Sequence, residues 1–520
     1  MFAAGKLARA PSWPGWPCHL GYYQVLLFVP LTPYNAVFIA DKVRELYMAH
    51  SGLSVLILAG GKATRFKSER PKLLHSLAGR RLGEYILRTA QALAPERLYM
   101  VVGFQAAEMR QAFSRPGLEF IEQTEQLGTG HALLVSRAEL ERCTSEFVMV
   151  LVGDAPLLEP DTLRNLLATH RRERAACTVL STRLDSPFGY GRIVRAAGRR
   201  VRAIVEEKVA TSAQKKIKEI NTGILCFSRA PLLAHLGELS RENAQREYLL
   251  TDMVEIFNRH RLKVTAFEAP AAEAEGINDR EQLADVEKML RRRKAADLMK
   301  AGVTIQDPDA TYLDLDVEVG PDTIIEPGVS LRGQTKVGSG CHLQAHSTIT
   351  ESVLADGVTI RPCCVIDESQ VGPGAALGPF ARLRMGAVVE AGARVGNFVE
   401  MKKSKLGPGS KAQHLTYLGD ATVGPRVNIG AGTITCNYDG VKKKPTIIEE
   451  GAFIGSGNML VAPVRIGKGA YTAAGSTITE DVPPESLAIG RTRQVNKEGW
   501  ARERKSAASP KGSNASKPQE

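Results

Sequence analysis

The hydrophobic pattern divides the chain into two parts of different period. Between about residues 53 and 278, apolar runs alternate with segments of helical spacing. Residues 53–59, 98–102 and 147–152 are almost entirely apolar, as in strands buried on both faces of a sheet, and residues 82–92 have helical spacing. This alternation predicts an α/β domain with a mostly parallel, Rossmann-like sheet, whose ligands would bind at the carboxyl ends of the strands.

The second part has a six-residue period. From about residue 303 to residue 490, aliphatic–glycine pairs recur, and several lie six residues apart, as at Val371 and Leu377 or Val423 and Ile429. Such a period is typical of hexapeptide repeats, in which each aliphatic side chain stacks on its counterpart in the next coil. At about 18 residues per coil, this part predicts a left-handed parallel β-helix of about ten coils.

A helical segment links the two parts. It contains the basic run Arg291–Lys294, which we expect to face solvent. The tail is rich in Lys, Ser, Pro and Ala and is predicted to be largely disordered, although its start, residues 497–500, is expected to pack. The predicted order is an N-terminal extension (1–50), the α/β domain (51–278), the linker helix (279–302), the β-helix (303–491) and the tail (492–520).

The N-terminal extension is apolar. Residues 10–40 carry no charged side chain, and this length could span a bilayer. Pro30 and Pro33 lie inside the stretch, and no small-residue cleavage site follows it, which argues against an anchor and against a signal peptide. We interpret residues 1–47 as a poorly ordered extension without stable membrane insertion, with Met48 as a candidate initiator and a membrane anchor as the alternative.

The net charge of +12 is diffuse apart from the tail, where residues 491–520 contribute +5. A surface that binds nucleic acid would be clustered and interleaved with aromatic residues, so small phosphorylated substrates explain the basicity better. The eight cysteines show no C-x-x-C spacing. This pattern indicates reduced thiols in a reducing compartment rather than a zinc ribbon or a disulfide framework.

A glycine-rich loop follows the first predicted strand. Residues 58–65 read Leu-Ala-Gly-Gly-Lys-Ala-Thr-Arg, and residues 70–72 read Arg-Pro-Lys. Glycines allow backbone N–H groups to approach a phosphate, while Arg65 and Lys72 supply positive charge. The loop lacks the G-K-[ST] ending of a Walker A motif, and a tight strand-to-helix turn is the alternative interpretation.

This loop resembles the L-A-A-G-x-G-T-R signature of sugar-phosphate nucleotidyltransferases. Together with later motifs it resembles, from about Ser54 to Trp500, the bifunctional bacterial enzymes that make UDP-N-acetylglucosamine. Their two activities are an N-acetylglucosamine-1-phosphate uridyltransferase and a glucosamine-1-phosphate acetyltransferase. The later motifs are Glu125–Ala132, Val152–Asp154, Gly189–Arg192, Val205–Lys208, Glu219–Gly223 and Glu275–Asn278.

The resemblance implies a uridyltransferase site. Asp154 and Asn278 would hold Mg²⁺, and Arg65 and Lys72 would act as catalytic cations on the phosphates. Taken alone, Asp154 could be a turn or capping carboxylate, but it directly follows a buried strand. The residues implied for UTP and N-acetylglucosamine-1-phosphate are Leu58, Ala59, Gly60, Gly61, Lys72, Gln123, Gly128, Thr129, Val152, Gly153, Asp154, Gly191, Glu206, Asn221 and Asn278.

Within that set the resemblance gives each group a part of the substrates. Gln123, Gly128 and Thr129 would recognise the uracil. Gly191, Glu206 and Asn221 would contact the sugar.

The sequence departs from the family pattern at a few positions. Ala63 replaces a glycine, Gly60 replaces an alanine, Val152 replaces a tyrosine and Met385 replaces a proline. A methyl group at position 63 is harmless only where φ is negative. We expect the changes at positions 63 and 152 to tune affinity and the one at 385 to be minor.

Polar clusters interrupt the hexapeptide repeat, and the resemblance implies an acetyltransferase there. His414 would be the general base for the 2-amino group of glucosamine-1-phosphate, since its ordinary pKa lies near neutrality. The sugar phosphate would be bound by Arg384, Lys402, Tyr417 and Asn428. Acetyl-CoA would be bound by Ala431, Asn437, Tyr438, Ser456, Ala474 and Arg491.

The sequence therefore predicts a cytoplasmic bifunctional transferase that uses Mg²⁺, feeds cell-wall and lipopolysaccharide precursor synthesis, and forms homotrimers through its β-helix. The alternative is a monofunctional sugar-1-phosphate nucleotidyltransferase whose β-helix is architectural or binds an effector. A decayed, non-enzymatic scaffold would lack metal ligands or phosphate cations, whereas Asp154, Asn278, Arg65 and Lys72 are all present.

Overall fold

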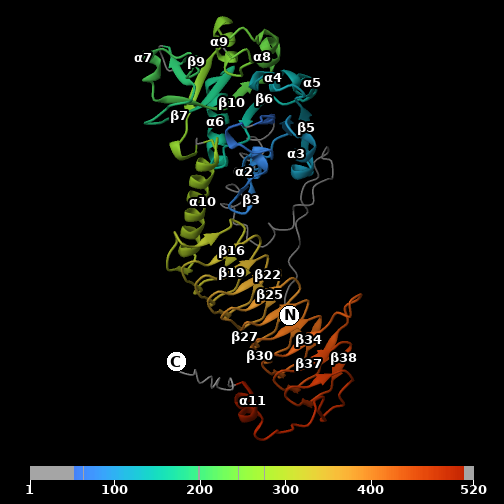
Figure 1. The fold of residues 1–520 in the computed structure, drawn as a ribbon. Coiled ribbons are helices and arrows are strands. Elements are labelled where there is room, and N and C mark those ends of the chain that lie inside the picture. Colours follow the sequence, from blue (N-terminus) through green and yellow to red (C-terminus); the bar gives the residue numbers. More distant parts are fainter. Residues whose placement is uncertain (1–51, 63, 197–199, 244, 274–275, 509–520) are drawn as a thin grey trace, which may run out of the picture. The chain divides into compact units, whose positions relative to one another are not determined.

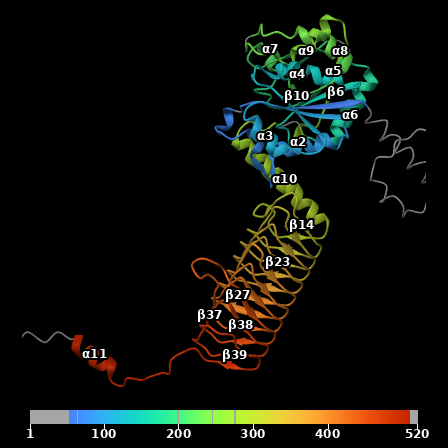
Figure 2. The ribbon, with the colours of Figure 1, turned by 90° about the vertical axis from the view of Figure 1, so that its right-hand side faces the viewer.

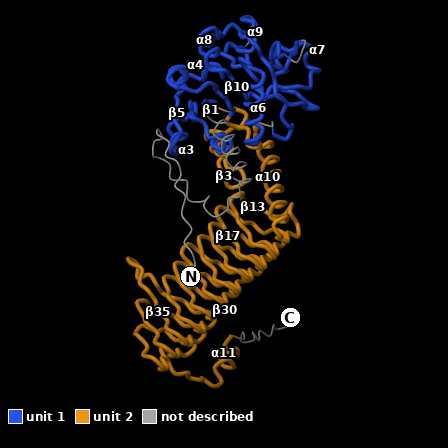
Figure 3. Tube along the Cα trace, turned by 180° about the vertical axis from the view of Figure 1, so that it is seen from behind, with its two compact units in different colours: residues 1–61, 86–152, 158–274 blue, residues 62–85, 153–157, 275–520 orange. Residues whose placement is uncertain are grey.

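The computed structural model describes residues 52–508 apart from residues 63, 197–199, 244 and 274–275 (Figure 1). The predicted N-terminal extension, with its candidate initiator Met48, and the substituted position Ala63 lie outside the described residues. The chain divides into two compact units, which Figure 3 shows in two colours. The first holds residues up to 61, 86–152 and 158–274, and the second holds residues 62–85, 153–157 and 275 onward.

The first unit is built on one mixed, mostly parallel sheet, which confirms the predicted α/β class. Its strand order is β11-β7-β10-β6-β1-β4-β5, with β8 paired to β10 and β9. Only β10 runs antiparallel to its neighbours β6 and β7 along this order. The strands are β1 (Leu53–Ala59), β4 (Arg97–Val102), β5 (Leu118–Glu122), β6 (Phe147–Val152), β7 (Cys177–Arg183), β8 (Arg192–Arg195), β9 (Val201–Val205), β10 (Glu219–Ser228) and β11 (Val264–Glu268).

Helices lie on both faces of this sheet, with α4 and α9 on one side and α3 on the other (Figure 2). Phe257 of α9 packs edge-on against Phe227 of β10, with ring centroids 6.1 Å apart, so α9 is anchored in the core. The helices are α2 (Leu82–Gln91), which continues from the second unit into the first, α3 (Ala106–Phe113), α4 (Thr129–Val135), α5 (Arg137–Arg142), α6 (Pro160–Glu173), α7 (Ser212–Lys215), α8 (Arg229–His235) and α9 (Asp252–Arg259).

The second unit contains the β-helix, whose coils each add a strand to three parallel sheets (Figure 1). The sheets have 11, 10 and 9 strands, which confirms the prediction of about ten coils. They run from β12 (Thr304–Ile305) to β41 (Leu487–Ala488), from β13 (Tyr312–Leu313) to β40 (Thr477–Ile478) and from β14 (Glu318–Val319) to β38 (Val464–Ile466).

Buried aliphatic side chains form the predicted ladder. Leu343, Ile360 and Leu377 pair in register on successive strands and are fully buried. Most steps between such positions along this sheet are 17 or 18 residues, and the longest is the 25 residues from Ile429 to Ile454, which are also paired. The additional residues form a loop, residues 437–444, that leaves the coil without displacing the ladder.

The predicted long helix is α10 (Arg280–Lys300). The expectation that its basic run faces solvent is confirmed for Arg292 and Arg293, which are exposed, whereas Arg291 and Lys294 are partly buried. The Arg291 guanidinium lies 4.3 Å from the centroid of the Tyr312 ring, and Arg292 donates two hydrogen bonds to Asp309, at 2.7 and 2.6 Å. These contacts fasten the helix to the first coil, because Tyr312 belongs to β13 and Asp309 lies in the bend between β12 and β13.

The C-terminal segment differs from the expectation for the tail. Residues 500–508 form a helix, α11 (Trp500–Ala508), all of whose residues are exposed. Within this single chain Trp500 is 51% exposed, and the packing expected for residues 497–500 stays a prediction. Over the described part of the chain, no helix has both the length and the apolar composition that a membrane crossing requires.

Candidate active sites

The residues predicted to recognise uracil lie in the first unit, where β5 ends. Gln123 follows β5 directly and is buried. Its carboxamide donates a hydrogen bond to the Gly128 carbonyl at 3.0 Å and lies 3.2 Å from His131 Nδ1. A Cβ added at Gly60 would lie 2.7 Å from Gln123 Oε1, so the glycine at position 60 leaves room for the carboxamide.

A glycine turn at the start of α4 is joined to the segment before α9. Gly128 has φ of +107°, and a Cβ there would overlap the Tyr248 carbonyl oxygen. Gly130 N–H donates to that same oxygen at 2.7 Å, and the Thr129 hydroxyl accepts from Leu250 N–H at 3.1 Å. Position 128 therefore requires glycine, both for its backbone conformation and for this close approach.

Tyr248 and His131 were missed by the sequence reasoning. Their rings stack with centroids 5.9 Å apart, beside the predicted Gln123 and Gly128. His131 lies inside the motif Glu125–Ala132, which could have drawn attention to it. No motif marked Tyr248, because only folding brings it to α4.

The residues predicted to contact the sugar also come together in the first unit. Asn221 N–H donates to the Gly191 carbonyl at 2.9 Å, and a Cβ at Gly191 would lie 3.4 Å from Glu206 Oε1. The register of β10 against β7 shifts between Asn221 and Leu225, a bulge of the kind that often re-aims side chains next to active sites. Burial raises the pKa of the Glu206 carboxyl.

Val152, which replaces the family's tyrosine, borders the same region. A Cβ at Gly223 would lie 2.9 Å from Val152 Cγ1, and Gly223 has φ of +81°. The branched side chain therefore packs against a glycine on β10 and fills part of the space beside the bulge.

The predicted phosphate and metal residues lie in the second unit, as two cation–oxygen pairs. Lys72, in a 3₁₀ turn (Lys72–Leu74), forms an ion pair with Asp154. Arg65, in another turn (Thr64–Phe66), donates to Asn278 Oδ1 at 2.7 Å. The Ile277 N–H donates to the Asp154 carbonyl at 3.0 Å, so the segments that carry Asp154 and Asn278 are joined by a backbone hydrogen bond.

These donors suit a hard divalent cation. A carboxylate and an amide carbonyl are the ligand types that Mg²⁺ accepts, with water and phosphate oxygens completing the octahedron. Gly276 lies close by, and a Cβ there would come 3.6 Å from Asp154 Oδ1. Both oxygens face cations in this structure, Asp154 facing Lys72 and Asn278 facing Arg65.

The predicted sugar-phosphate residues of the β-helix align on successive coils. Arg384 of β25 (Arg382–Arg384) pairs in register with Lys402 of β28 (Glu400–Lys402), which pairs with Gly419 of β31 (Tyr417–Gly419). The positive charges of Lys443 and Arg384 lower the pKa of Lys402. The concentration of cations fits a phosphate group, and Lys443 is a member that the sequence reasoning missed.

Gly419 creates the space for two predicted side chains. A Cβ there would overlap the Tyr417 hydroxyl and lie 2.7 Å from Asn437 Nδ2. The Asn437 amide donates to Asp420 Oδ2 at 2.5 Å and is largely buried. Asp420 was missed by the sequence reasoning, although the 17 residues between it and Asn437 equal one coil.

The predicted base, His414, and three of the residues predicted for acetyl-CoA occupy one corner of successive coils. Backbone hydrogen bonds run from Gly432 N–H to the His414 carbonyl (3.2 Å), from Gly457 N–H to the Ala431 carbonyl (2.7 Å) and from Gly475 N–H to the Ser456 carbonyl (2.8 Å). His414, Ala431, Ser456 and Ala474 therefore form a column. The His414 side chain, at the end of β30 (Lys411–His414), is exposed.

The remaining predicted residues flank this column. Arg491 Cδ would lie 3.9 Å from a Cβ at Gly475, beside Ala474. Asn428 pairs in register with Lys411 on β30. Tyr438 is exposed in the loop of residues 437–444 and donates its hydroxyl proton to the Gly440 carbonyl at 2.6 Å.

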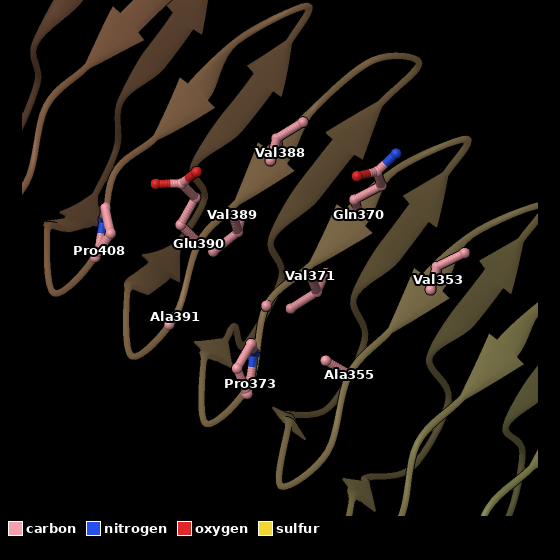
Figure 4. Close-up of a pocket in the computed structure, with 11 residues that line it drawn as sticks. Val353, Ala355, Gln370, Val371, Pro373, Val388, Val389, Glu390, Ala391 and Pro408 are labelled. Carbon is pink, nitrogen blue, oxygen red and sulfur yellow. The ribbon is translucent and has the colours of Figure 1, made fainter.

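A separate hollow of about 470 Å³ lies along the sheet that contains β20 (Val353–Leu354), β23 (Gln370–Val371) and β26 (Val388–Val389). Figure 4 shows Val353, Gln370 and Glu390 on its wall. None of the residues predicted for either reaction lines it, so it belongs to neither candidate site.

The fold and the two sites define a class: a nucleotidyltransferase domain followed by a hexapeptide-repeat transferase. Models of known families support this. The MobA-like NTP transferase domain matches residues 55–252, and the bacterial transferase hexapeptide (six repeats) matches residues 316–351 and 445–480.

Curated relatives identify the family. The bifunctional protein GlmU of Koribacter versatilis is 48% identical over 453 residues, which cover 86% of this chain and 96% of the relative. That of Anaeromyxobacter sp. (strain Fw109-5) is 49% identical over 471 residues (89% and 96%), and that of Streptococcus agalactiae serotype III is 44% identical over 447 residues (86% and 97%). The chain belongs to the GlmU family of bifunctional uridyltransferase/acetyltransferases, which make UDP-N-acetylglucosamine.

Proposed function

We propose that acetyl transfer takes place in the β-helix, with the residues assigned above. The 2-amino nitrogen of glucosamine-1-phosphate attacks the thioester carbonyl of acetyl-CoA, the imidazole of His414 takes the proton of the nitrogen, and the CoA thiolate leaves and is protonated. Arg384 and Lys402 bind the sugar phosphate. The observation that carries the proposal is the alignment of these two cations on successive coils, beside Tyr417 and Asn437, whose side chains fill the space left by Gly419.

The acetyl donor extends along the column that His414 begins. Ala431, Ser456 and Ala474 present small side chains at successive turns, so an extended cofactor can lie close to the backbone there. Arg491 supplies a cation beside the last of these turns, suited to the phosphates of CoA. Tyr438 and Asn437 border the acetyl group.

The product, N-acetylglucosamine-1-phosphate, is then uridylylated by the nucleotidyltransferase part of the chain. Gln123, Gly128 and Thr129 bind the base, and Gly191, Glu206 and Asn221 bind the sugar. Asp154 and Asn278 hold Mg²⁺, which supplies charge neutralisation of the triphosphate when bound. Lys72 and Arg65 turn from these oxygens to the phosphates and stabilise the negative charge as pyrophosphate leaves.

We further propose that the protein is a homotrimer assembled through the β-helix. Phe380, Phe398 and Leu415 stand one above another at a corner, 49%, 57% and 64% exposed, with the two phenyl rings stacked 5.3 Å apart. Such an apolar ridge needs a partner surface, and Leu415 directly follows His414. Light scattering should give three times the 56.3 kDa chain mass.

The location proposed is the cytoplasm, where UTP and acetyl-CoA are available. The seven described cysteines are all free thiols, in keeping with a reducing compartment.

Two assays on the purified protein test the assignment of the two sites. Coenzyme A thiol release is measured with acetyl-CoA and glucosamine-1-phosphate, and pyrophosphate release is measured with UTP, Mg²⁺ and N-acetylglucosamine-1-phosphate. His414→Ala should abolish thiol release and keep pyrophosphate release, and Asp154→Asn should do the reverse. If folded wild-type protein releases pyrophosphate but no thiol, the β-helix is architectural, and the acetyltransferase assignment is wrong.

A further inference from the structure

Three metal-binding side chains converge on the first unit, apart from every residue assigned above. His235 is the last residue of α8, Glu238 ends the following 3₁₀ turn (Leu236–Glu238), and His260 caps the C-terminus of α9. Within the described residues, this is the only group of three or more His, Cys, Asp or Glu whose ligand atoms all lie within 4.8 Å of one another.

The carboxylate lies between the two imidazoles. Glu238 Oε1 is 2.7 Å from His235 Nδ1 and 2.8 Å from His260 Nε2, and Oε2 is 3.0 Å from the same Nε2. The imidazole rings are tilted by 30° to one another, with centroids 4.0 Å apart. Ligand atoms of a tetrahedral zinc ion are about 3.3 Å apart, given metal–ligand distances of about 2.0–2.1 Å. The N–O separations of 2.7 and 2.8 Å would therefore have to widen by about 0.5–0.6 Å to admit an ion.

The orientation of the rings is partly fixed. His235 packs edge-on against Phe257, with centroids 6.2 Å apart and an interplanar angle of 80°, and Phe257 is fully buried. Side-chain exposures of 21% for His235, 37% for Glu238 and 43% for His260 leave the cluster open to solvent on one side. Water can therefore occupy the fourth position, as it does where three protein ligands hold zinc.

The local electrostatics favour a cation. Helices α8 and α9 both end here, and the C-terminal end of a helix carries partial negative charge. The Glu238 carboxylate adds negative charge between the two imidazoles. One opposing charge is present: an Arg259 nitrogen lies 3.8 Å from Glu238 Oε2, but that side chain is 66% exposed and can turn to solvent.

We propose that His235, Glu238 and His260 form a site for one borderline-soft divalent ion of the zinc class, held by two imidazole nitrogens and one carboxylate oxygen. Imidazole ligands favour Zn²⁺, Ni²⁺ and Cu²⁺ over Mg²⁺, so this site is chemically distinct from the oxygen donors Asp154 and Asn278. Each neutral imidazole moves its proton to the ring nitrogen that faces away and presents its lone pair to the metal.

The ion would cross-link the ends of α8 and α9, which are separated by 25 residues from His235 to His260. Helix α9 begins at Asp252, directly after Thr251, whose hydroxyl lies 3.5 Å from Glu206 Oε1. The metal would thus fix one end of the helix whose other end borders the proposed sugar site. Binding to the folded form alone raises the thermal stability of the first unit.

The test is a titration of the full-length protein with Zn²⁺ in a large excess of Mg²⁺, followed by calorimetry and by the unfolding temperature. The expected result is one tight Zn²⁺ per chain, a higher unfolding temperature, and a zinc K-edge spectrum with nitrogen and oxygen neighbours, two of them imidazole. His260→Gln should weaken the tight site by at least about 100-fold, since loss of mere supporting groups already costs 10–100-fold.

His342→Gln is the matched control. His342 Nε2 lies 2.7 Å from Glu326 Oε1 as a single imidazole–carboxylate pair, so its loss should leave the tight site unchanged. Pyrophosphate release in the presence of Mg²⁺ checks that the His260→Gln variant is folded. If that variant is not folded, the Glu238→Gln variant is used in its place. Zinc binding that is no tighter in wild type than in the variants, or sulfur neighbours at the K-edge, would overturn the proposal.

Discussion

Replacing Gly419 by alanine tests the acetyltransferase site through one added methyl group. The φ of Gly419 lies outside the left-handed region, so alanine meets no backbone penalty there. The new Cβ would overlap the Tyr417 hydroxyl and lie 2.7 Å from both Tyr417 Cε1 and Asn437 Nδ2. The perturbation is therefore confined to two side chains that the proposed site uses.

The size of the effect follows from these distances. Unstrained contacts between such atoms are about 3.5–4.0 Å, so the tyrosine ring and the amide must each move by about 1 Å. A displacement of that size at a reacting centre costs about 100-fold in rate, and we expect this loss in kcat/KM for acetyl transfer. The stability cost should stay at about 1–3 kcal/mol, because both neighbours are side chains that can rotate.

The assay compares thiol release with pyrophosphate release in the same preparation. Gly419→Ala should lower the first about 100-fold and leave the second within about twofold, because its neighbours belong to the β-helix alone. The control is Gly237→Ala, a glycine of ordinary φ whose Cβ would come no closer than 3.8 Å to Arg137. It should change neither activity.

Acetyl transfer by Gly419→Ala within about twofold of wild type would refute the reasoning, since it would show that Tyr417 and Asn437 can shift by about 1 Å without consequence. A parallel fall in pyrophosphate release would also contradict it, because that result indicates general misfolding rather than a local displacement.

Two further predictions concern the first unit. Gly128→Ala should abolish pyrophosphate release and spare thiol release, because the φ of +107° and the Tyr248 carbonyl both exclude a Cβ at this position. Uridylyl transfer retained by this variant would contradict the prediction. Burial lowers the pKa of His170 from 6.5 to about 4. Burial of the neutral His170 therefore contributes fully to the free energy of unfolding above pH 6.5. This contribution is lost as the pH falls toward 4, and the loss amounts to roughly 3 kcal/mol. Calorimetric unfolding of the full chain against pH should show a flatter profile for His170→Gln than for wild type, and identical profiles would disprove it.

The β-helix could be predicted because its sequence pattern repeats over a short distance along the chain. Each coil needs an aliphatic residue at the same place, so the ladder through Leu343, Ile360 and Leu377 is visible as a period in the sequence. Contacts made by surface charges have no such period. Arg291 was therefore expected to face solvent, whereas it is partly buried and its guanidinium stacks on the Tyr312 ring of the first coil.

Prediction of the two sites from the sequence had the same limit. Motifs identified the residues that we propose bind substrate, but they left out the residues that support them, such as Tyr248 beside Gly128 and Asp420 beside Asn437. The second pair could have been found, since 17 residues is one coil. The first could not, because Tyr248 reaches α4 through the folding of more than 100 intervening residues rather than through any repeat.

The regularity of the β-helix explains how residues of the proposed acetyltransferase site can be placed where the repeat is interrupted. Regular coils place equivalent positions one above another, so a column such as His414, Ala431 and Ser456 is positioned by backbone hydrogen bonds and needs no specific side-chain packing. The aliphatic ladder supplies the stability, and positions facing outward are free to vary. The loop of residues 437–444 uses this freedom: the ladder passes from Ile429 to Ile454 without interruption, and the eight additional residues carry Asn437, Tyr438 and Lys443 to the sugar-phosphate cations. A binding site can thus be added to the scaffold without cost to its core.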